Sequence, residues 1–281
     1  MPVYHQGYET YQGERLPLWW RWVPLWREEI APFLNSRLFL FFMALAILPW
    51  ALVAISQVLL HFKVMANVPV FDEKVAAFLL ANPWQDFMMA FLSIWVGSGL
   101  VARDRRDKTI EVFLGRALSP VQYLWAKAFS LAGFFLLFTL LPVWLMVLLH
   151  VGITGDFFYF IQHFRILWGS LLYTVVGVGG LVLFVLALSS LSSSPRLTGL
   201  LLIGILFFGT TAGTLFGALG NNPWASMFGI LLELSVLASH CLGADEMFKV
   251  SFSHSMIYFA VLTAASLGLL WWNFSRKRLL R

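Results

Sequence analysis

The chain has 281 residues, of which 60% are hydrophobic and 12% are charged. This composition excludes an ordinary soluble domain, in which about 25% of the residues are charged, and the mean hydropathy of +0.80 predicts a membrane protein. The net charge of +5 comes from positive residues at the ends of apolar stretches, so we expect no nucleic-acid partner.

Residues 1–36 precede the first apolar stretch and combine tryptophans with charged side chains; the tryptophans are Trp19, Trp20, Trp22 and Trp26. This mixture predicts a cytoplasmic amphipathic helix, or elbow, that lies along the membrane surface. A solvated tail followed by a signal anchor is the simpler alternative. Acidic residues and the lack of a continuous apolar core argue against a cleavable signal peptide.

Residues 37–281 contain six apolar stretches, each near the roughly 20 residues that a membrane-spanning helix needs. In chain order these stretches are Leu38–Leu60, Gln85–Val101, Ala128–Leu149, Ile166–Leu188, Leu197–Leu219 and Met256–Trp272. The pattern predicts an all-α integral membrane protein with a six-helix transmembrane domain.

Positive residues set the orientation of this domain. Four of the 19 Lys and Arg residues fall in the proposed outer segments, namely Lys63, Lys74, Arg165 and Lys249, and the others fall on the opposite side. Lys and Arg concentrate in cytoplasmic loops. We therefore expect both termini in the cytoplasm and a multi-pass protein of the inner (cell) membrane, surrounded by the lipid bilayer.

Residues 102–121 join the second and third spans and are densely charged. Charges are costly inside a bilayer and cheap at its cytoplasmic face, so this segment predicts a cytoplasmic hairpin. A short helix from Asp107 to Arg116 would place each terminal charge favourably in the helix dipole, and Ser119-Pro120 would end it. A positive-inside loop without a partner is the plainer interpretation.

Small residues recur in the fifth span at Gly209, Gly213 and Gly217. This spacing predicts a helix face that allows close helix packing. The pattern does not distinguish packing within one chain from packing between two subunits.

Residues 220–255 are too long for a simple turn and include the apolar stretch 230–242. We expect an extracytoplasmic segment that either re-enters the membrane or lies on the surface as a helix. His240, Cys241 and His254 fall here, but their spacing matches no compact metal motif, so we predict no metal site.

The middles of the six spans contain no Asp, Glu, Lys, Arg or His. Ion-coupled carriers usually need such groups. The sequence also lacks a G-x-x-x-x-G-K-[ST] phosphate loop. If the chain moves a solute uphill, we expect the energy to come from an ATPase on another polypeptide.

The hairpin contains Asp107-Lys-Thr-Ile-Glu111, then Leu118-Ser-Pro-Val-Gln-Tyr-Leu124, then Ala126-Lys127. This order resembles the type-2 (ABC-2-like) class of ABC transporter permeases, in which a charged, Thr-containing turn leads to Glu, Ser/Thr-Pro, an aromatic or aliphatic pair and Gly-Lys. Two positions depart from the pattern, with Ala126 where Gly is common and Gln122 where Arg is common.

The resemblance implies a half-transporter whose hairpin forms a coupling helix seated in a separate ABC ATP-binding subunit, which carries ATP and Mg²⁺. From this resemblance together with the charged and apolar side chains of the hairpin, we assign to partner contact Arg105, Arg106, Lys108, Thr109, Glu111, Phe113, Arg116, Ser119 and Pro120. The resemblance also implies a second permease subunit, as a homodimer or a heterodimer. We expect no catalytic residue and no cofactor on this chain.

We therefore expect the permease subunit of an ATP-driven ABC transporter, and the resemblance favours export. A second interpretation is a mechanotransmitting or structural membrane subunit that uses a partner ATPase to move or assemble other proteins without carrying a solute. An intramembrane enzyme has the least support, because no His, Asp, Glu or Cys lies deep within a predicted span.

Overall fold

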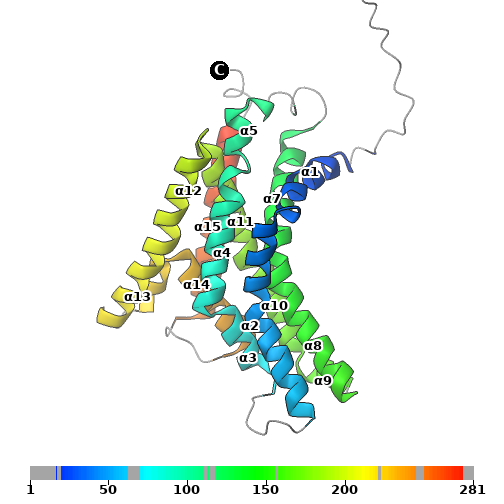
Figure 1. Cartoon of the computed structure of the whole chain (residues 1–281). Coiled ribbons are helices and arrows are strands. Elements are labelled where there is room, and N and C mark those ends of the chain that lie inside the picture. Colours follow the sequence, from blue (N-terminus) through cyan, green and yellow to red (C-terminus); the bar gives the residue numbers. More distant parts are fainter. Residues whose placement is uncertain are drawn as a thin grey trace, which may run out of the picture.

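The computed structural model describes residues 17, 20–62, 70–110, 113, 118–155, 157–220, 223–244 and 250–274. Within these ranges every regular element is a helix, which confirms the all-α prediction. Figure 1 shows most of the long helices running between the end that carries α5 (Ala102–Arg106) and the opposite end, near α3 (Glu73–Leu80).

Six continuous helical stretches in the described residues are long and apolar enough to cross a membrane. They are α2 (Arg37–His61), Pro83–Arg106, Pro120–Thr154, Phe164–Leu191, Pro195–Leu219 and α15 (Phe252–Phe274). Each predicted span lies inside one of them, so the chain is a multi-pass membrane protein. The helices extend beyond the predicted apolar cores into the polar residues that flank them.

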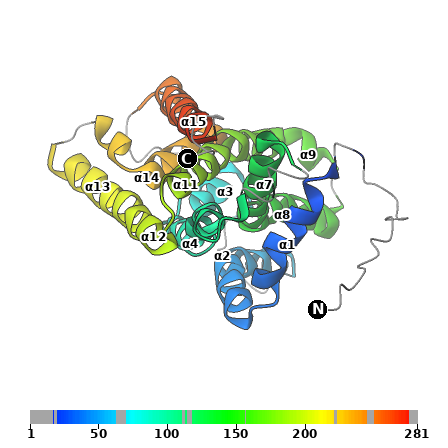
Figure 2. The ribbon, with the colours of Figure 1, turned by 90° about the horizontal axis from the view of Figure 1, so that it is seen from above.

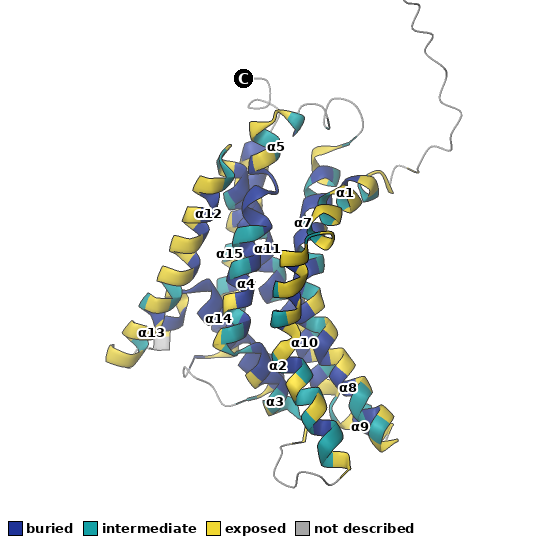
Figure 3. Cartoon of the chain, in the orientation of Figure 1, coloured by how far each residue is buried: buried dark blue, intermediate teal, exposed yellow. Residues whose placement is uncertain are grey.

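The second, third and fourth stretches form the centre of the bundle, whereas the first, fifth and sixth are peripheral. Figure 2 shows α11 (Gly179–Leu191) and α4 (Pro83–Trp95) near the centre, with α12 (Pro195–Ile203) and α13 (Gly209–Gly220) extending to the left and α15 at the upper edge. In Figure 3 much of the surface of α12 and α13 is exposed, as expected for helices that face lipid.

Prolines lie in the interior of two of the stretches. Pro49 lies inside α2, and Pro142 lies in α8 (Leu140–Thr154), just after α7 (Pro120–Phe138) ends. A proline has no N–H, so the carbonyl four residues earlier loses its helical donor. Side chains at the start of α4 donate to both of these carbonyls: Trp84 Nε1 to Leu45 O (3.2 Å) and Gln85 Nε2 to Phe138 O (2.9 Å).

Two stretches contain π-helical turns, at Tyr173–Val178 between α10 (Phe164–Leu172) and α11, and at Gly204–Phe208 between α12 and α13. The second stretch changes pitch at the 3₁₀ turn Gly97–Gly99 before α5 begins. These turns change the helical pitch without ending the apolar span.

The outer segment forms η5 (Pro223–Phe228) and α14 (Ile230–Leu242). Every side chain of α14 except that of His240 is buried, so α14 is not a surface helix. Close approach of its neighbours depends on glycine, because a Cβ added at Gly169 would lie 2.5 Å from Cys241 O, and one at Gly177 would lie 3.0 Å from Leu237 Cδ2.

The glycine face of the fifth span packs against this segment of the same chain. A Cβ at Gly209 would lie 2.5 Å from Phe228 O, and one at Gly213 would lie 2.7 Å from Ala225 O. Gly217 is half-buried. Gly209 and Gly213 therefore serve packing within the chain, between α13 and the η5 segment.

Two further helices position the hairpin end of the bundle and its opposite end. The first is α1 (Val23–Leu34), which packs on α7 and α2 through Leu25, Trp22 and Phe33. The second is α3, capped at its start by the Asp72 carboxylate, which accepts from Val75 N (2.9 Å). The sequence reading did not predict α3.

Candidate coupling site at the hairpin

The end of the bundle that carries α5 brings together three segments that are distant in the sequence. These are α5 itself, α1, and the first two turns of α7. Figure 1 shows α1 beside α7 near this end. Charged and hydroxyl side chains from the three segments meet here.

Lys127 of α7 is the centre of this arrangement, and its side chain is fully buried. Its Nζ pairs with Glu29 Oε1 of α1 and with Asp104 Oδ2 of α5, the latter at 2.6 Å. The same Asp104 oxygen accepts from the Tyr123 hydroxyl at 2.7 Å. We call these four residues the Lys127 cluster.

A buried ammonium group is tolerated only where opposite charges and hydrogen bonds replace its water. Lys127 has two carboxylates, and its Nζ also lies 5.4 Å from the Tyr123 ring centroid. Phe113 and Phe274 flank that ring, with centroids 6.3 and 5.8 Å from it. One lysine thus fixes α1, α5 and α7 to one another in an apolar setting.

A second contact ties the base of the hairpin to the end of α11. The Ser189 hydroxyl oxygen accepts from Val101 N and Ala102 N, each at 3.1 Å, and its proton goes to Ser98 O at 3.1 Å. Two backbone donors at the first turn of α5 are satisfied in this way. Ser189 is fully buried, so this cap is part of the packed interior.

The neighbouring Ser190 extends the contact to the last span. Arg105 of α5 donates from Nη1 to Ser190 O, and Asn273 Nδ2 of α15 donates to Ser190 Oγ at 3.0 Å. The hairpin is therefore joined directly to α11, as it is to α1 and α7, and indirectly to α15 through Ser190. The predicted partner residue Arg105 points into this contact and is half-buried.

The tip of the hairpin is exposed. Arg106 Nε donates to Asp107 Oδ1 at 2.9 Å, and this contact holds the pKa of the Asp107 carboxyl below its ordinary value. Lys108 is the only described non-glycine residue with positive φ, at 57°. Its left-handed conformation turns the chain after α5 and presents its side chain to solvent.

The expected helix from Asp107 to Arg116 does not begin at Asp107, because α5 ends at Arg106 and Asp107 and Lys108 form a turn. Helical backbone resumes at Thr109, whose hydroxyl donates to Asp104 O at 3.3 Å. Glu111 and Arg116, both assigned to partner contact, lie outside the described residues.

The remaining predicted residues lie in the C-terminal half of the hairpin, which leads into α7. Phe113 is half-buried against Tyr123. Ser119 caps α7 in a reciprocal box, in which Gln122 N donates to Ser119 Oγ (3.2 Å) and Ser119 N donates to Gln122 Oε1 (3.0 Å). Pro120 occupies the first helical turn, where a missing N–H costs nothing.

Sequence reasoning assigned no role to Glu29, Asp104, Ser189 or Ser190. The available signal was Lys127, a lysine that begins an apolar run in a helix and so needs a buried counter-charge. Neither a protein-family model nor a curated protein sequence matches the chain. A functional assignment therefore depends on the hairpin and the contacts that hold it.

Proposed function

We propose that this chain is the permease subunit of an ATP-driven ABC transporter, an exporter, moved by a separate ATP-binding subunit that carries ATP and Mg²⁺. The observation that carries the proposal is the Lys127 cluster, because it locks the hairpin of an ABC-2-like sequence to two neighbouring helices through a buried lysine. A second permease subunit would complete the membrane pathway.

The mechanism is transmission of force. Motion of α5 reaches α1 and α7 through Lys127, and it reaches α11 and α15 through Ser189, Ser190 and Asn273. Packed elements with hydrogen bonds at both ends move together as rigid bodies. A partner that displaces the hairpin thereby displaces the third, fourth and sixth spans.

The exposed tip supplies the surface for that partner. Arg106, Asp107 and Lys108 are exposed at the turn, so they are available for ion pairs that do not disturb the cluster beneath. In this proposal the hairpin end faces the cytoplasm, both termini lie there, and the protein resides in the inner membrane. Helix α1, with Trp20 exposed before it, serves as the amphipathic elbow at the membrane surface.

The first test is affinity purification of the tagged membrane complex, with identification of the soluble proteins that accompany it. We expect an ATP-binding subunit with the unaltered chain, and its loss or weakening with the double change Arg106→Ala/Lys108→Ala. Arg37→Ala is the matched control, because Arg37 is an exposed arginine at the start of α2 outside the hairpin. Absence of an ATPase from an intact complex would refute the proposal.

Reconstituted vesicles separate transport from the mechanical alternative. A transporter shows ATPase activity that rises with its solute and accumulates that solute in an ATP-dependent way. With a mechanotransmitting subunit, the partner ATPase hydrolyses ATP and no solute crosses the membrane.

A further inference from the structure

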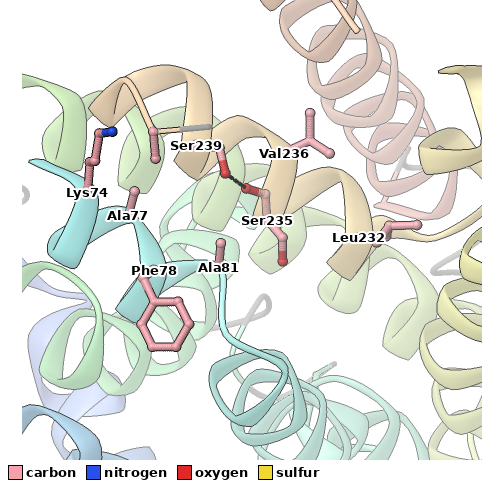
Figure 4. Close-up of a pocket in the computed structure, with 9 residues that line it drawn as sticks. Lys74, Ala77, Phe78, Ala81, Leu232, Ser235, Val236 and Ser239 are labelled. Carbon is pink, nitrogen blue, oxygen red and sulfur yellow. Dashed lines mark hydrogen bonds between the residues drawn. The ribbon is translucent and has the colours of Figure 1, made fainter. Parts of the chain in front are cut away.

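A narrow groove between α3 and α14 has one polar wall and one apolar wall (Figure 4). It lies toward the end of the bundle opposite α5, and its volume is about 280 Å³, slightly below the range of pockets for drug-sized ligands. Ser235 and Ser239 of α14 form the polar wall, and Ala77, Phe78 and Ala81 of α3 lie opposite. The groove therefore suits a small polar headgroup that is attached to a flexible chain.

Both hydroxyl protons of the polar wall are already used within the protein. Ser235 Oγ donates to Asp86 Oδ2 at 2.9 Å, and Ser239 Oγ donates to Ser235 O at 3.1 Å, the bond drawn as a dashed line in Figure 4. A serine hydroxyl has one proton and two lone pairs. While these bonds hold, each oxygen can accept a hydrogen bond from a ligand and neither can donate one. The wall thus selects a ligand that donates hydrogen bonds.

The charges around the groove favour a cationic donor. The Asp86 carboxylate is half-buried behind Ser235, and no cationic side chain of the described residues forms an ion pair with it. Donation to this carboxylate polarises the Ser235 hydroxyl, which makes its oxygen a stronger acceptor. Lys74 lies at the rim on α3 and is already engaged in an interaction of its own, so its charge is not what selects the ligand.

The surroundings of the groove are those of a lipid-facing surface. Phe78 is 66% exposed, and Val70 before α3 and Phe87 after it are also exposed. Large exposed aromatic side chains of this kind in a membrane protein face the bilayer. A lipid therefore reaches the groove without crossing the protein.

We propose that this groove binds one phospholipid with a primary ammonium headgroup, phosphatidylethanolamine, from the surrounding bilayer. The ammonium group donates to Ser235 Oγ and Ser239 Oγ and lies near the Asp86 carboxylate, which favours a cation there. Ala77 and Ala81 contact the upper part of one acyl chain. A choline headgroup has the same charge, but its nitrogen has no proton to donate. The site includes no hairpin residue, so it holds whether or not the hairpin meets an ATPase.

Native mass spectrometry of the delipidated full chain in detergent tests this site, with phosphatidylethanolamine, phosphatidylcholine and phosphatidylglycerol of equal chain length as probes. We expect one phosphatidylethanolamine to be retained above the non-specific background. Its preference over phosphatidylcholine should be about tenfold, because one hydrogen bond from a charged donor is worth about that factor.

Two substitutions separate the hydroxyl oxygens from the charge. Ser239→Ala removes one acceptor and should lower the preference to below about threefold. Asp86→Asn keeps an oxygen for Ser235 but removes the negative charge, and it should lower the preference as well. The matched control is Ser193→Ala, because Ser193 is an exposed serine between α11 and α12, outside the groove; it should leave the preference unchanged.

Ala81→Leu should fill the groove and reduce retention of phosphatidylethanolamine, whereas Ala264→Leu, the same enlargement at an exposed position of α15, should not. Equal retention of phosphatidylethanolamine and phosphatidylcholine by the unaltered chain would overturn the proposal. Stronger retention of phosphatidylglycerol would also overturn it, because an anionic lipid is not favoured near Asp86. If Ala81→Leu does not fold, the serine variants decide, because a Ser239→Ala preference equal to that of Ser193→Ala contradicts the role of the hydroxyl oxygen.

Discussion

Replacement of Lys127 by Met is the most informative single change. Met has a similar length and no charge, so it fills the space of the lysine stem while removing the ammonium group. Glu29 and Asp104 then face each other without the cation that both of them contact. Tyr123 continues to donate to Asp104 and compensates for only part of the loss.

The magnitude follows from burial. Lys127 is fully buried, and the side chains of Glu29 and Asp104 are 21% and 13% exposed. Removal of one partner from a buried ion pair costs about 3–5 kcal/mol, because the remaining charges lose their compensation. For a chain of this size that corresponds to a fall of about 10 °C in apparent melting temperature.

The assay is thermal unfolding of the purified chain in one fixed detergent, followed by intrinsic tryptophan fluorescence. Lys108→Met is the matched control, since Lys108 is exposed and its charge is solvated. The triple change Lys127→Met/Glu29→Gln/Asp104→Asn should recover much of the lost stability, because a neutral cluster leaves no buried charge unpaired.

Two results would show that the cluster does not hold the hairpin. One is a Lys127→Met chain as stable as the Lys108→Met control. The other is a triple variant no more stable than Lys127→Met, which would place the cost in packing and not in charge. With the ATPase subunit present, Lys127→Met should also reduce coupling of hydrolysis to movement, whereas Arg37→Ala, outside the hairpin, should not.

Three further changes test the surrounding contacts by thermal unfolding. Ser189→Ala should lower the free energy of unfolding by about 1–3 kcal/mol, because two backbone donors of the hairpin lose their acceptor. Its control, Ser93→Ala, removes only a hydrogen bond within its own helix and should lower the free energy of unfolding by less. Gly213→Ala should lower the free energy of unfolding by about 1–3 kcal/mol, because the added methyl group overpacks against Ala225 O. Gly204→Ala in the same stretch should be tolerated, because its added methyl group has no neighbour within 4 Å. Lys108→Gly should raise stability by up to about 1 kcal/mol, because glycine adopts positive φ without steric cost, and a lower melting temperature would contradict this reading of the turn.

The sequence predicts the six spans well because a bilayer imposes one simple requirement on each of them. Continuous apolar length decides where a helix crosses, and this is a local property. The ends are less predictable, since the helices continue into polar residues. The third stretch begins at Pro120, eight residues before its predicted apolar core, and so includes Lys127 within the helix.

The contacts that define the site depend on residues far apart in the chain. Lys127 and Glu29 are separated by 98 positions, and Ser189 lies 87 positions from Ala102. No periodicity relates such pairs. The burial of α14 could not be predicted from the sequence either, because an apolar stretch of 13 residues is compatible with a surface helix or a buried one. The glycines that allow its burial lie on other helices.

The second stretch joins the hairpin to the opposite half of the bundle. Near its start, Trp84 and Gln85 donate to the carbonyls freed by Pro49 and Pro142, and the next residue, Asp86, accepts from Ser235 of α14. Its last turn is α5, held by the Lys127 cluster and by Ser189. A helix held by side-chain contacts at both ends transmits displacement along its length. Within this stretch the described backbone departs from α-helical pitch at one place before α5, the turn around Gly97–Gly99. Motion of the hairpin is therefore expected to bend this stretch at the glycines and to reach the Asp86–Ser235 contact only to the extent that the turn stays rigid.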